Sequence, residues 1–297
     1  MRGIGRALQL DTVRYGVRCL RWRCDPALMR CPSCRSRSGT CIDRKVWITS
    51  LVRCEACRLL YRRPQEPEGF AARFYQEEYQ SALTTALPEP ELLATMLASA
   101  FRGTEKDLRD KIETFRALGL PVGARILDYG SSWGYGVWQL NVAGYQAEGF
   151  EVSRPRASYG SRSLGVTIHT DPSQLAKHAY DAVFTNHVLE HVPDPNMALT
   201  QIALALRPGG WLVAFFPNGS DECRRANPER FHCNWGRLHP VYLSDDYCLD
   251  RLRGKPNWMI SKPYESRPDL AQLALWDQAH VWKGDMSENE MMLVARF

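Results

Sequence analysis

The chain has 297 residues, of which 44% are hydrophobic and 24% charged, and it carries a formal net charge of +5. This composition is typical of an ordinary soluble globular protein, and the length suits about two domains. No uninterrupted apolar run approaches the ~18–20 residues that span a bilayer, which excludes a membrane-spanning protein.

The charge is concentrated at the start of the chain. Residues 1–63 contain 15 Lys and Arg against 4 Asp and Glu, a net charge of +11, so the remainder is acidic. Such a basic segment favours an anionic partner, namely nucleic acid, a nucleotide-linked sugar or phospholipid head groups, although a solvated basic face fits equally well. Residues 1–28 are Arg-rich and could be a transit peptide or a membrane-surface helix. We expect a poorly ordered basic extension instead.

Two C-x-x-C pairs follow in residues 29–64. They are separated by 19 residues and consist of Cys31, Cys34, Cys54 and Cys57. This is the four-thiolate spacing of a zinc ribbon, and a segment this short needs a metal to hold its fold. The chain has ten cysteines without a convincing secretory signal, which favours a reducing cytoplasm over disulfides. A redox pair would stand near a βαβ unit, and these pairs do not.

Residues 65–118 are predicted to be a linker and a helical cap. Residues 59–61 are expected to form the last ribbon strand, and residues 74–79 a short aromatic helix. Residues 87–91 indicate a linker. The apolar spacing of residues 91–118 then predicts helix with a break at Gly103 and a face that covers a sheet.

A βαβ unit is predicted from residue 125 onward. A short apolar run ends in Asp128, a turn containing Gly130 and Gly134 follows, and a helical pattern leads to a second strand that ends in Glu151. Glycines let a backbone approach a ligand closely, and an acid about 20 residues past such a turn can bind ribose hydroxyls. The G-x-G-x-x-G phosphate fingerprint of nicotinamide enzymes is absent.

The remaining strands are predicted at regular intervals, with helices between them. They cover residues 147–152, 167–170, 181–185, 211–216, 258–261 and 291–297. Alternating strands and helices indicate an α/β fold with a doubly wound sheet. Ligands bind such sheets at the carboxyl ends of the strands. Polar residues follow these ends at Asp128, Glu151, Asp171, Asn186 and Asn218.

Three further segments carry a resemblance to a known family. They read YDAVFTNHVLE at residues 180–190, HVPDP at 191–195 and LRPGGWLVAFFPN at 206–218. Together with the glycine turn, they resemble the class I S-adenosylmethionine-dependent methyltransferases over roughly residues 118–297. The resemblance implies a Rossmann-like sheet of seven strands with a terminal antiparallel hairpin, in a catalytic domain at residues 119–297. Ser132 replaces the usual middle glycine of the turn.

The resemblance also implies a set of cofactor-binding residues. They are Asp128, Gly130, Ser132, Gly134, Glu151, Asp171, Asn186 and His191. S-adenosylmethionine needs a carboxylate for its ribose, which we assign to Glu151, and an apolar slot for its adenine. The small Ser132 preserves the path of the turn and offers a hydroxyl to the ligand.

Transfer to an oxygen or carbon acceptor requires a base with a pKa near neutrality, and histidine suits this role. We expect His239, then His187, to be that base. His187 follows the fourth strand, whereas His232 and His239 flank a polar and aromatic segment that we expect to shape the acceptor pocket. No Asp and Asn cluster at ligand spacing is present, which disfavours a metal-assisted reaction.

The N-terminal half adds a second resemblance. A zinc ribbon, an F-Y-x-x-x-Y segment and this core look like a bacterial group that works on glycans, lipopolysaccharide or secondary metabolites. The similar sugar C-methyltransferases carry an extra C-terminal domain, which we do not expect in this chain. We therefore predict methyl transfer to a sugar, a glycan intermediate or a related small metabolite.

Two alternatives remain open. An RNA methyltransferase would use the basic head, but the chain has no N-P-P-Y-type motif and no run of basic and aromatic residues in its catalytic half. A non-catalytic scaffold is disfavoured by the retained Asp128, Gly130, Gly134 and Glu151. The sequence leaves the oligomeric state open.

Overall fold

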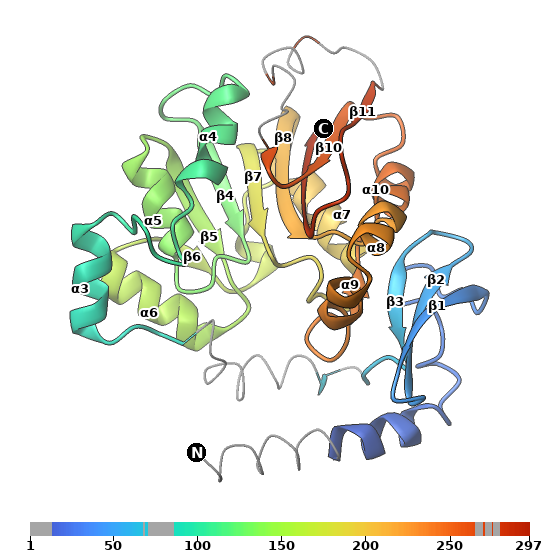
Figure 1. Ribbon diagram of the computed structural model, residues 1–297. Coiled ribbons are helices and arrows are strands. Elements are labelled where there is room, and N and C mark those ends of the chain that lie inside the picture. The colour runs from blue at the N-terminus through green and yellow to red at the C-terminus, as the bar shows by residue number, and fades with distance from the viewer. Residues whose placement is uncertain (1–13, 68, 71–85, 265–269, 271–274, 276–279) are drawn as a thin grey trace.

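The computed structural model describes residues 14–67, 69–70, 86–264, 270, 275 and 280–297. Its main feature is an eight-stranded sheet in the order β11-β10-β12-β8-β7-β4-β5-β6 (Figure 1). These strands are β4 (Arg125–Tyr129), β5 (Gln146–Phe150), β6 (Ile168–His169), β7 (Tyr180–Asn186), β8 (Leu206–Pro217), β10 (Asn257–Ser261), β11 (Val281–Lys283) and β12 (Glu290–Arg296).

The sheet confirms the predicted Rossmann-like α/β fold. All seven predicted strands are present, and β5, β4, β7 and β8 run parallel to one another. Strand β12 pairs antiparallel with both β8 and β10, as the predicted terminal pair requires. An eighth short strand, β11, extends the sheet beside β10 and lies between the two members of that pair in sequence. The pair is therefore not a tight hairpin.

Helices cover the sheet and connect its strands. They are α3 (Pro90–Ala98), α4 (Arg109–Ala117), α5 (Tyr135–Val142), α6 (Arg154–Leu164), α7 (Pro195–Ala205), α8 (Asp221–Ala226), α9 (Pro228–Asn234) and α10 (Asp245–Arg251), with a 3-10 turn, η3 (Pro172–Gln174). The predicted break at Gly103 falls in the turns between α3, which ends at Ala98, and α4, and Gly103 there has a left-handed φ of +72°. The candidate helix at residues 74–79 lies outside the described residues.

The two faces of the sheet belong to separate hydrophobic clusters, as the alternation of strand side chains dictates. In β4, Ile126 packs with Ile112 and Phe115 of α4. Its neighbour Leu127 packs on the opposite face with Ile202 of α7. Helix α4 therefore covers one face, as its apolar spacing predicted.

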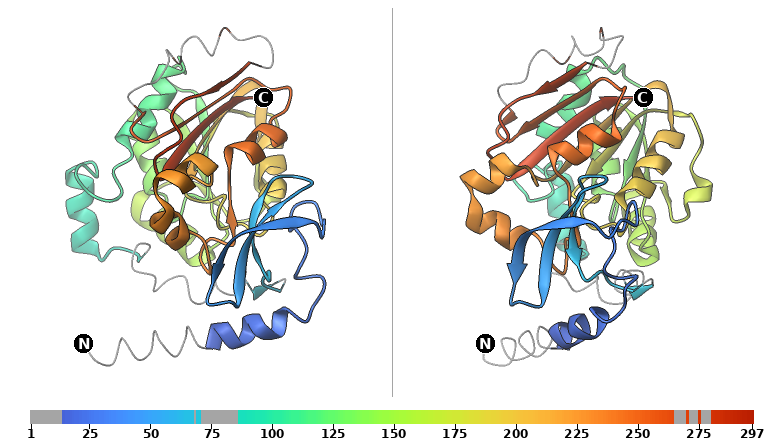
Figure 2. Two further views of the ribbon diagram at one scale, coloured as in Figure 1. Left: turned by 45° about the vertical axis from the view of Figure 1, so that its right-hand side comes forward. Right: turned by 90° about the vertical axis from the view of Figure 1, so that its right-hand side faces the viewer.

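A second, four-stranded antiparallel sheet forms the N-terminal module in the order β1-β2-β3-β9. Its strands are β1 (Gly39–Lys45), β2 (Thr49–Cys54), β3 (Leu60–Arg63) and β9 (Val241–Tyr242). Strand β9 lies almost 180 residues after β3 in the sequence, so the module is completed by a distant segment. All views place the module beside α8 and α9 (Figure 2). The predicted domain boundaries remain predictions.

The basic extension contains an ordered helix at residues 14–22, which the sequence analysis missed. Tyr15 of this helix donates a hydrogen bond to Glu66 and also contacts the guanidinium of Arg62. Residues 1–13 lie outside the described part of the chain. Among the described residues, no helix combines the length and the apolar character that crossing a bilayer requires.

Candidate functional site

One large cavity of about 1100 Å³ opens at the carboxyl ends of β4, β5 and β7. Most of its lining falls into three groups. The first comes from the glycine turn and β5, and includes Tyr129, Gly130, Ser132, Phe150 and Val152. The second comes from two segments, the end of β7 with the loop after it and the loop before β9, and includes Asn186, His187, Glu190, His191 and His239. The third belongs to the N-terminal module, and includes Ala27, Leu28, Pro32, Arg35, Gln65, Glu66 and Pro67.

We call residues 128–134 and 150–153 the cofactor end of this cavity. The turn there has left-handed backbone at Gly130, Ser132 and Gly134, with φ of +86°, +52° and +81°. A Cβ on Gly130 would lie 2.2 Å from a methyl carbon of Val188, so glycine is required at this position. Ser132 adopts a conformation that costs a non-glycine residue about 1–2 kcal/mol, and the backbone path of the turn is nevertheless preserved.

Glu151 fixes the turn from the neighbouring strand. Its carboxylate accepts hydrogen bonds from the backbone N–H of Ser132 at 3.0 Å and of Ser153 at 2.8 Å. Burial raises the pKa of Glu151, against the lowering effect of these bonds and of Arg156. The acid predicted to bind ribose is therefore held beside the turn.

Asp128 lies behind the turn at the end of β4. Burial, with a smaller contribution from the charge of Glu151, raises the pKa of Asp128 to about 7. A Cβ on Gly136 would lie 2.3 Å from its Oδ2, so this glycine makes room for the carboxyl group. Asp128 supports the turn from within the core and is not among the residues that line the cavity.

The other groups at the cofactor end suit a polar ligand with an apolar ring. Ser132 Oγ accepts a hydrogen bond from Arg156 Nη1 at 2.9 Å, so the predicted hydroxyl is directed to a protein partner. Phe150 and Val152 line the same wall, and Val152 is 47% exposed. The chain thus offers an apolar slot next to a buried carboxylate, which is what S-adenosylmethionine requires.

We call Asn186, His187, Glu190, His191 and His239 the acceptor end. Asn186 and His191 line the cavity as predicted cofactor residues would, and their role toward the cofactor stays a prediction. Within the acceptor end, His187 lies between two carboxylates, with Nδ1 3.2 Å from Glu190 Oε1 and Nε2 2.6 Å from Glu290 Oε2. Burial lowers the pKa of His187, but these two hydrogen bonds outweigh that effect and raise the pKa to about 9. His187 is therefore a cation at neutral pH.

A lysine completes this charged network. Lys111 of α4 donates to Asn186 Oδ1 at 2.7 Å and to Glu290 Oε2 at 3.0 Å. Hydrogen bonding to His187 and the charge of Lys111 lower the pKa of Glu290, although burial opposes them. Sequence reasoning missed Lys111 and Glu290, because neither stands in a recognisable motif.

His191 and His239 face each other across the acceptor end. Their ring centroids are 4.7 Å apart, and both contribute to a cluster with Glu190. His191 donates from Nδ1 to the Leu238 carbonyl at 2.7 Å, and His239 Nδ1 is bonded to the Asn234 carbonyl. Burial lowers the pKa of His239, so this ring is neutral at pH 7.

The three ligand atoms of Glu190, His191 and His239 lie within 4.8 Å of one another. The sequence analysis disfavoured a metal-assisted reaction because no Asp and Asn cluster stands at ligand spacing. The fold brings a different group together, one glutamate and two histidines from two separate segments, which could hold a metal ion.

Some predicted site residues lie elsewhere. The carboxylate of exposed Asp171 accepts the Ser173 N–H at 2.8 Å and caps η3, outside the cavity lining. Asn218 is buried and donates to the carbonyls of Met286 and Glu288 at 2.8 Å. Like Asp128, Gly134 and Glu151, Asp171 is not among the residues that line the cavity, and its cofactor role stays a sequence-based prediction.

The four cysteines of the C-x-x-C pairs form one cluster in the N-terminal module. All four ligand sulfurs lie within 4.8 Å of one another, with Cys31–Cys57 at 3.5 Å and Cys34–Cys54 at 3.4 Å. Four thiolates around a tetrahedral zinc at ~2.3 Å stand about 3.8 Å apart. The ten cysteines are all described, and none forms a disulfide. The donor set and spacing fit a zinc ion.

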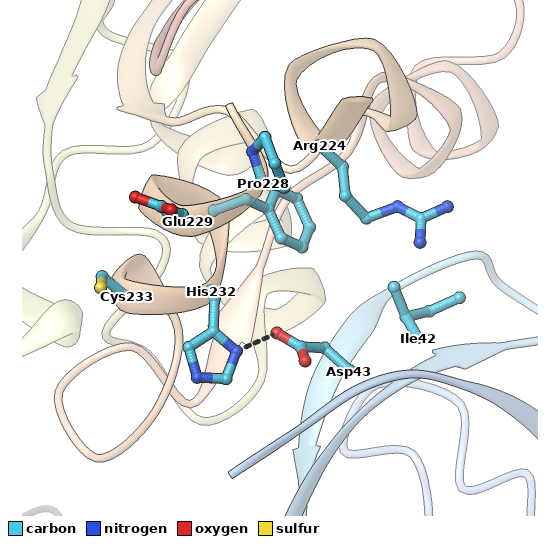
Figure 3. A pocket seen from close by; sticks show the side chains of 8 residues that line it. Ile42, Asp43, Arg224, Pro228, Glu229, His232 and Cys233 are labelled. Carbon is cyan, nitrogen blue, oxygen red and sulfur yellow. Dashed lines mark hydrogen bonds and ion pairs between the residues drawn. The ribbon is translucent and has the colours of Figure 1, made fainter. Parts of the chain in front are cut away.

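The segment between β8 and β9 has two sides with different partners. His239 lines the large cavity. His232 lines a separate cavity of about 480 Å³, where its Nδ1 lies 2.7 Å from Oδ2 of Asp43 in β1 (Figure 3). Trp235 donates to the same carboxylate at 2.8 Å. The segment predicted to shape the acceptor pocket thus also docks the N-terminal module.

The comparison with protein families identifies one match. A family model described as a methyltransferase domain matches residues 100–259. A curated relative, the ubiquinone biosynthesis O-methyltransferase of Chromobacterium violaceum, is 29% identical over 99 residues. The match covers 30% of this chain and 43% of the relative, so the chain spans less than half the length of the curated relative it matches.

Solved structures share the fold at low identity. The geranyl diphosphate C-methyltransferase of Streptomyces coelicolor A3(2), solved with Mg²⁺, geranyl diphosphate and S-adenosyl-L-homocysteine, is 14% identical with a TM-score of 0.51. The match covers 78% of this chain and 99% of that one. Phosphoethanolamine N-methyltransferase 2 of Haemonchus contortus, with S-adenosyl-L-methionine, is 14% identical with a TM-score of 0.50, over 80% and 62% of the chains.

Proposed function

This chain belongs to the methyltransferase-domain family, and on that basis we propose that it transfers the methyl group of S-adenosylmethionine to a hydroxyl group of a sugar or related small polar metabolite. The observation that carries the proposal is the single cavity of about 1100 Å³ that joins the cofactor end to the acceptor end. Its volume suits two small ligands together, since typical ligand pockets measure about 300–1000 Å³.

The cofactor end supplies the groups that hold S-adenosylmethionine. We assign the ribose to Glu151, which stands between the lining residues Phe150 and Val152 and is bonded to the glycine turn, although its own side chain is not among those that line the cavity. Phe150 and Val152 would provide an apolar surface for the adenine. The glycine turn exposes its backbone to the remaining part of the ligand. When bound, S-adenosylmethionine supplies a methyl group on a sulfonium, which is already activated for displacement.

The acceptor end must orient a hydroxyl and remove its proton. Between the two predicted bases, we favour His239. Its ring is neutral, and the Asn234 carbonyl holds the proton on Nδ1, which leaves the Nε2 lone pair available. His187 is protonated and both its nitrogens face carboxylates, so it is better suited to orienting Glu190 than to accepting a proton.

Two features support a sugar or a related polar acceptor. The acceptor end is lined by amide, imidazole and carboxylate groups, which suit a ligand rich in hydroxyls. Arg35 and Arg237 also line the cavity, and they would favour a phosphate-bearing form such as a nucleotide-linked sugar. The O-methyltransferase name of the curated relative supports oxygen as the acceptor atom. We further propose that the four cysteines hold a structural zinc and that the protein acts in the cytoplasm.

The proposal is tested in two steps. Calorimetry measures the binding of S-adenosylmethionine, and mass spectrometry then detects a methylated product in a panel of free and nucleotide-linked sugars. We expect His239→Ala to lower single-turnover rates ~10²–10⁴-fold with little change in cofactor affinity. His232→Ala, in the same segment but directed to Asp43, serves as the matched control and is expected to keep its rate.

Each alternative function has a distinct result. A chain that does not bind S-adenosylmethionine contradicts the proposal outright. Cofactor binding without turnover on any acceptor supports the scaffold. Methylation of RNA, with binding that weakens steeply as salt rises, supports the RNA methyltransferase.

A further inference from the structure

The acceptor end contains a buried carboxylate oxygen, Glu190 Oε2, in surroundings that favour a bound cation. Glu190 is completely buried, and its Oε1 is 3.2 Å from His187 Nδ1. Its other oxygen, Oε2, has no hydrogen-bond partner among the described residues. Buried polar atoms are almost always paired, because an unpaired one costs about 1–3 kcal/mol and a charged one more.

The two neighbouring histidines are oriented as metal ligands usually are. Each ring uses Nδ1 for a backbone carbonyl, Leu238 for His191 and Asn234 for His239. Metal-bound histidines almost always donate their second ring N–H in this way, because the bond fixes the tautomer and orients the lone pair. Both Nε2 atoms lack a hydrogen bond within the described part of the chain, and His191 Nε2 lies 3.9 Å from Glu190 Oε1.

From this geometry we propose that Glu190, His191 and His239 form a second metal site, which binds a zinc-type divalent ion at the acceptor end. Two histidines and one glutamate are a ligand set of catalytic zinc, with a fourth position left for substrate. Ligand atoms around such an ion stand about 3.4 Å apart. The present spacing, within 4.8 Å, requires side-chain shifts of about 1 Å.

The role of the ion rests on the proposed function. At the open position it would bind the acceptor hydroxyl and lower its pKa. The O–H proton then leaves to water, the oxygen–methyl bond forms, and the sulfur keeps the electron pair of the broken sulfur–methyl bond. With the ion bound, His239 Nε2 would be a metal ligand, and His239 would act as the base only in protein without the second ion.

Metal counting tests the site without any acceptor. Protein is dialysed against micromolar zinc and analysed for its metal content. We expect two ions per chain in wild type and in the control His232→Ala. Glu190→Gln, His191→Ala and His239→Ala should retain one ion and bind the second at least about 100-fold more weakly. One ion in wild type, or two tightly held ions in all three variants, would overturn the proposal.

Cobalt substitution shows which site has been lost. The four-cysteine site should give a strong thiolate-to-cobalt charge-transfer band, and the second site only weak bands without sulfur character. His239→Ala should lose the weak bands and keep the strong one. Loss of the strong band alone would contradict the assignment of the ligands.

The two proposals fail separately. Calorimetry of S-adenosylmethionine binding depends on the cofactor end and should be equal in wild type and in Glu190→Gln. Normal cofactor binding and turnover with a single ion per chain would reject the metal site and keep the methyltransferase. Two ions without cofactor binding would reject the proposed function.

Discussion

The two ends of the cavity are built in different ways. The cofactor end comes from β4, the glycine turn and β5, which are consecutive in the sequence and lie within residues 125–153. The acceptor end combines residues that follow β7 with residues that precede β9, and the N-terminal module closes one wall. A contiguous site can be built from one local motif, whereas a dispersed site depends on the packing of the whole molecule.

The acceptor end depends on the N-terminal module for its position. Strand β3 pairs with β9, and the Arg62 N–H donates to the Pro240 carbonyl at 2.7 Å, next to His239. Arg53 of β2 forms an ion pair with Asp221 at 2.7 Å. Loss of the metal from the module should therefore disturb the acceptor end more than the cofactor end.

The largest effect is expected from Cys54→Ser. Structural zinc in small modules contributes about 10–16 kcal/mol of apparent binding free energy, so its loss should unfold the module. Elemental analysis should find the four-cysteine ion missing, and turnover should be abolished. Cofactor affinity should fall less than turnover, because Glu151 and the glycine turn are bonded to each other within residues 125–153.

Cys41→Ser is the matched control for this variant. Cys41 is an exposed residue of the same module and lies outside the four-sulfur cluster, so both zinc and turnover should be retained. Equal loss of acceptor turnover and cofactor binding in Cys54→Ser would show that the two ends are one cooperative unit. The cofactor end would then depend on the N-terminal module as much as the acceptor end does.

The next largest effect tests the cofactor end alone. Glu151→Ala should weaken S-adenosylmethionine binding by about 1.5–3 kcal/mol, since it removes charged hydrogen-bond acceptors. Asp171→Ala should leave the affinity unchanged, because this carboxylate caps η3 outside the cavity. Calorimetry measures both. A strong effect of Asp171→Ala would restore the sequence-based prediction, and an inert Glu151→Ala would remove the ribose assignment.

A pH experiment tests the acceptor end. The folded pKa of His187, about 9, is above its ordinary value of 6.5. Its stabilising contribution is therefore fully present below pH 6.5 and is lost as the pH rises through 9. The ring is 41% exposed, which reduces the contribution to about 1 kcal/mol.

The measurement is the free energy of unfolding of wild type and His187→Gln between pH 6 and pH 10. The wild-type advantage should shrink across this range and vanish above pH 9. An advantage that is constant with pH would mean that His187 is neutral in the folded protein. It would then return as a candidate base.

The smallest effect concerns Ser132. Ser132→Gly relieves left-handed strain of about 1–2 kcal/mol, but it loses the bond to Arg156 and increases the entropy of the unfolded chain. The net change in unfolding free energy should stay below about 1 kcal/mol. Ser132→Ala keeps the strain and loses the bond, so it should be the less stable of the two. Chemical denaturation measures the unfolding free energy of both variants, and the opposite ranking would show that the turn is not strained.

Much of the fold could be predicted because its signals are local. Each predicted strand of the large sheet was found, since short apolar runs between turn residues indicate buried strands. The short strands β9 and β11 were missed. They have two and three residues, too few for a periodic pattern, and they exist only because a longer strand lies beside them.

The candidate site divides in the same way. The positions of Gly130, Gly134 and Glu151 at the turn followed from spacing, as did the grouping of the four cysteines. The protonation of His187 did not, because it depends on Glu290, a residue from the far end of the chain. Nor did the cluster of Glu190, His191 and His239, which requires two separate loops to meet.

The sequence by itself determined the βαβ unit, the order of the strands along the chain and the cysteine cluster. Backbone conformation at a glycine turn, burial along a strand and closely spaced thiolates are set mainly by neighbours in the chain. Only the tertiary structure decided which histidine is neutral, which carboxylate oxygen is unpaired and which module forms one wall of the acceptor end. Those properties depend on burial and on distances between residues far apart in the sequence, which are fixed only when the two sheets pack together.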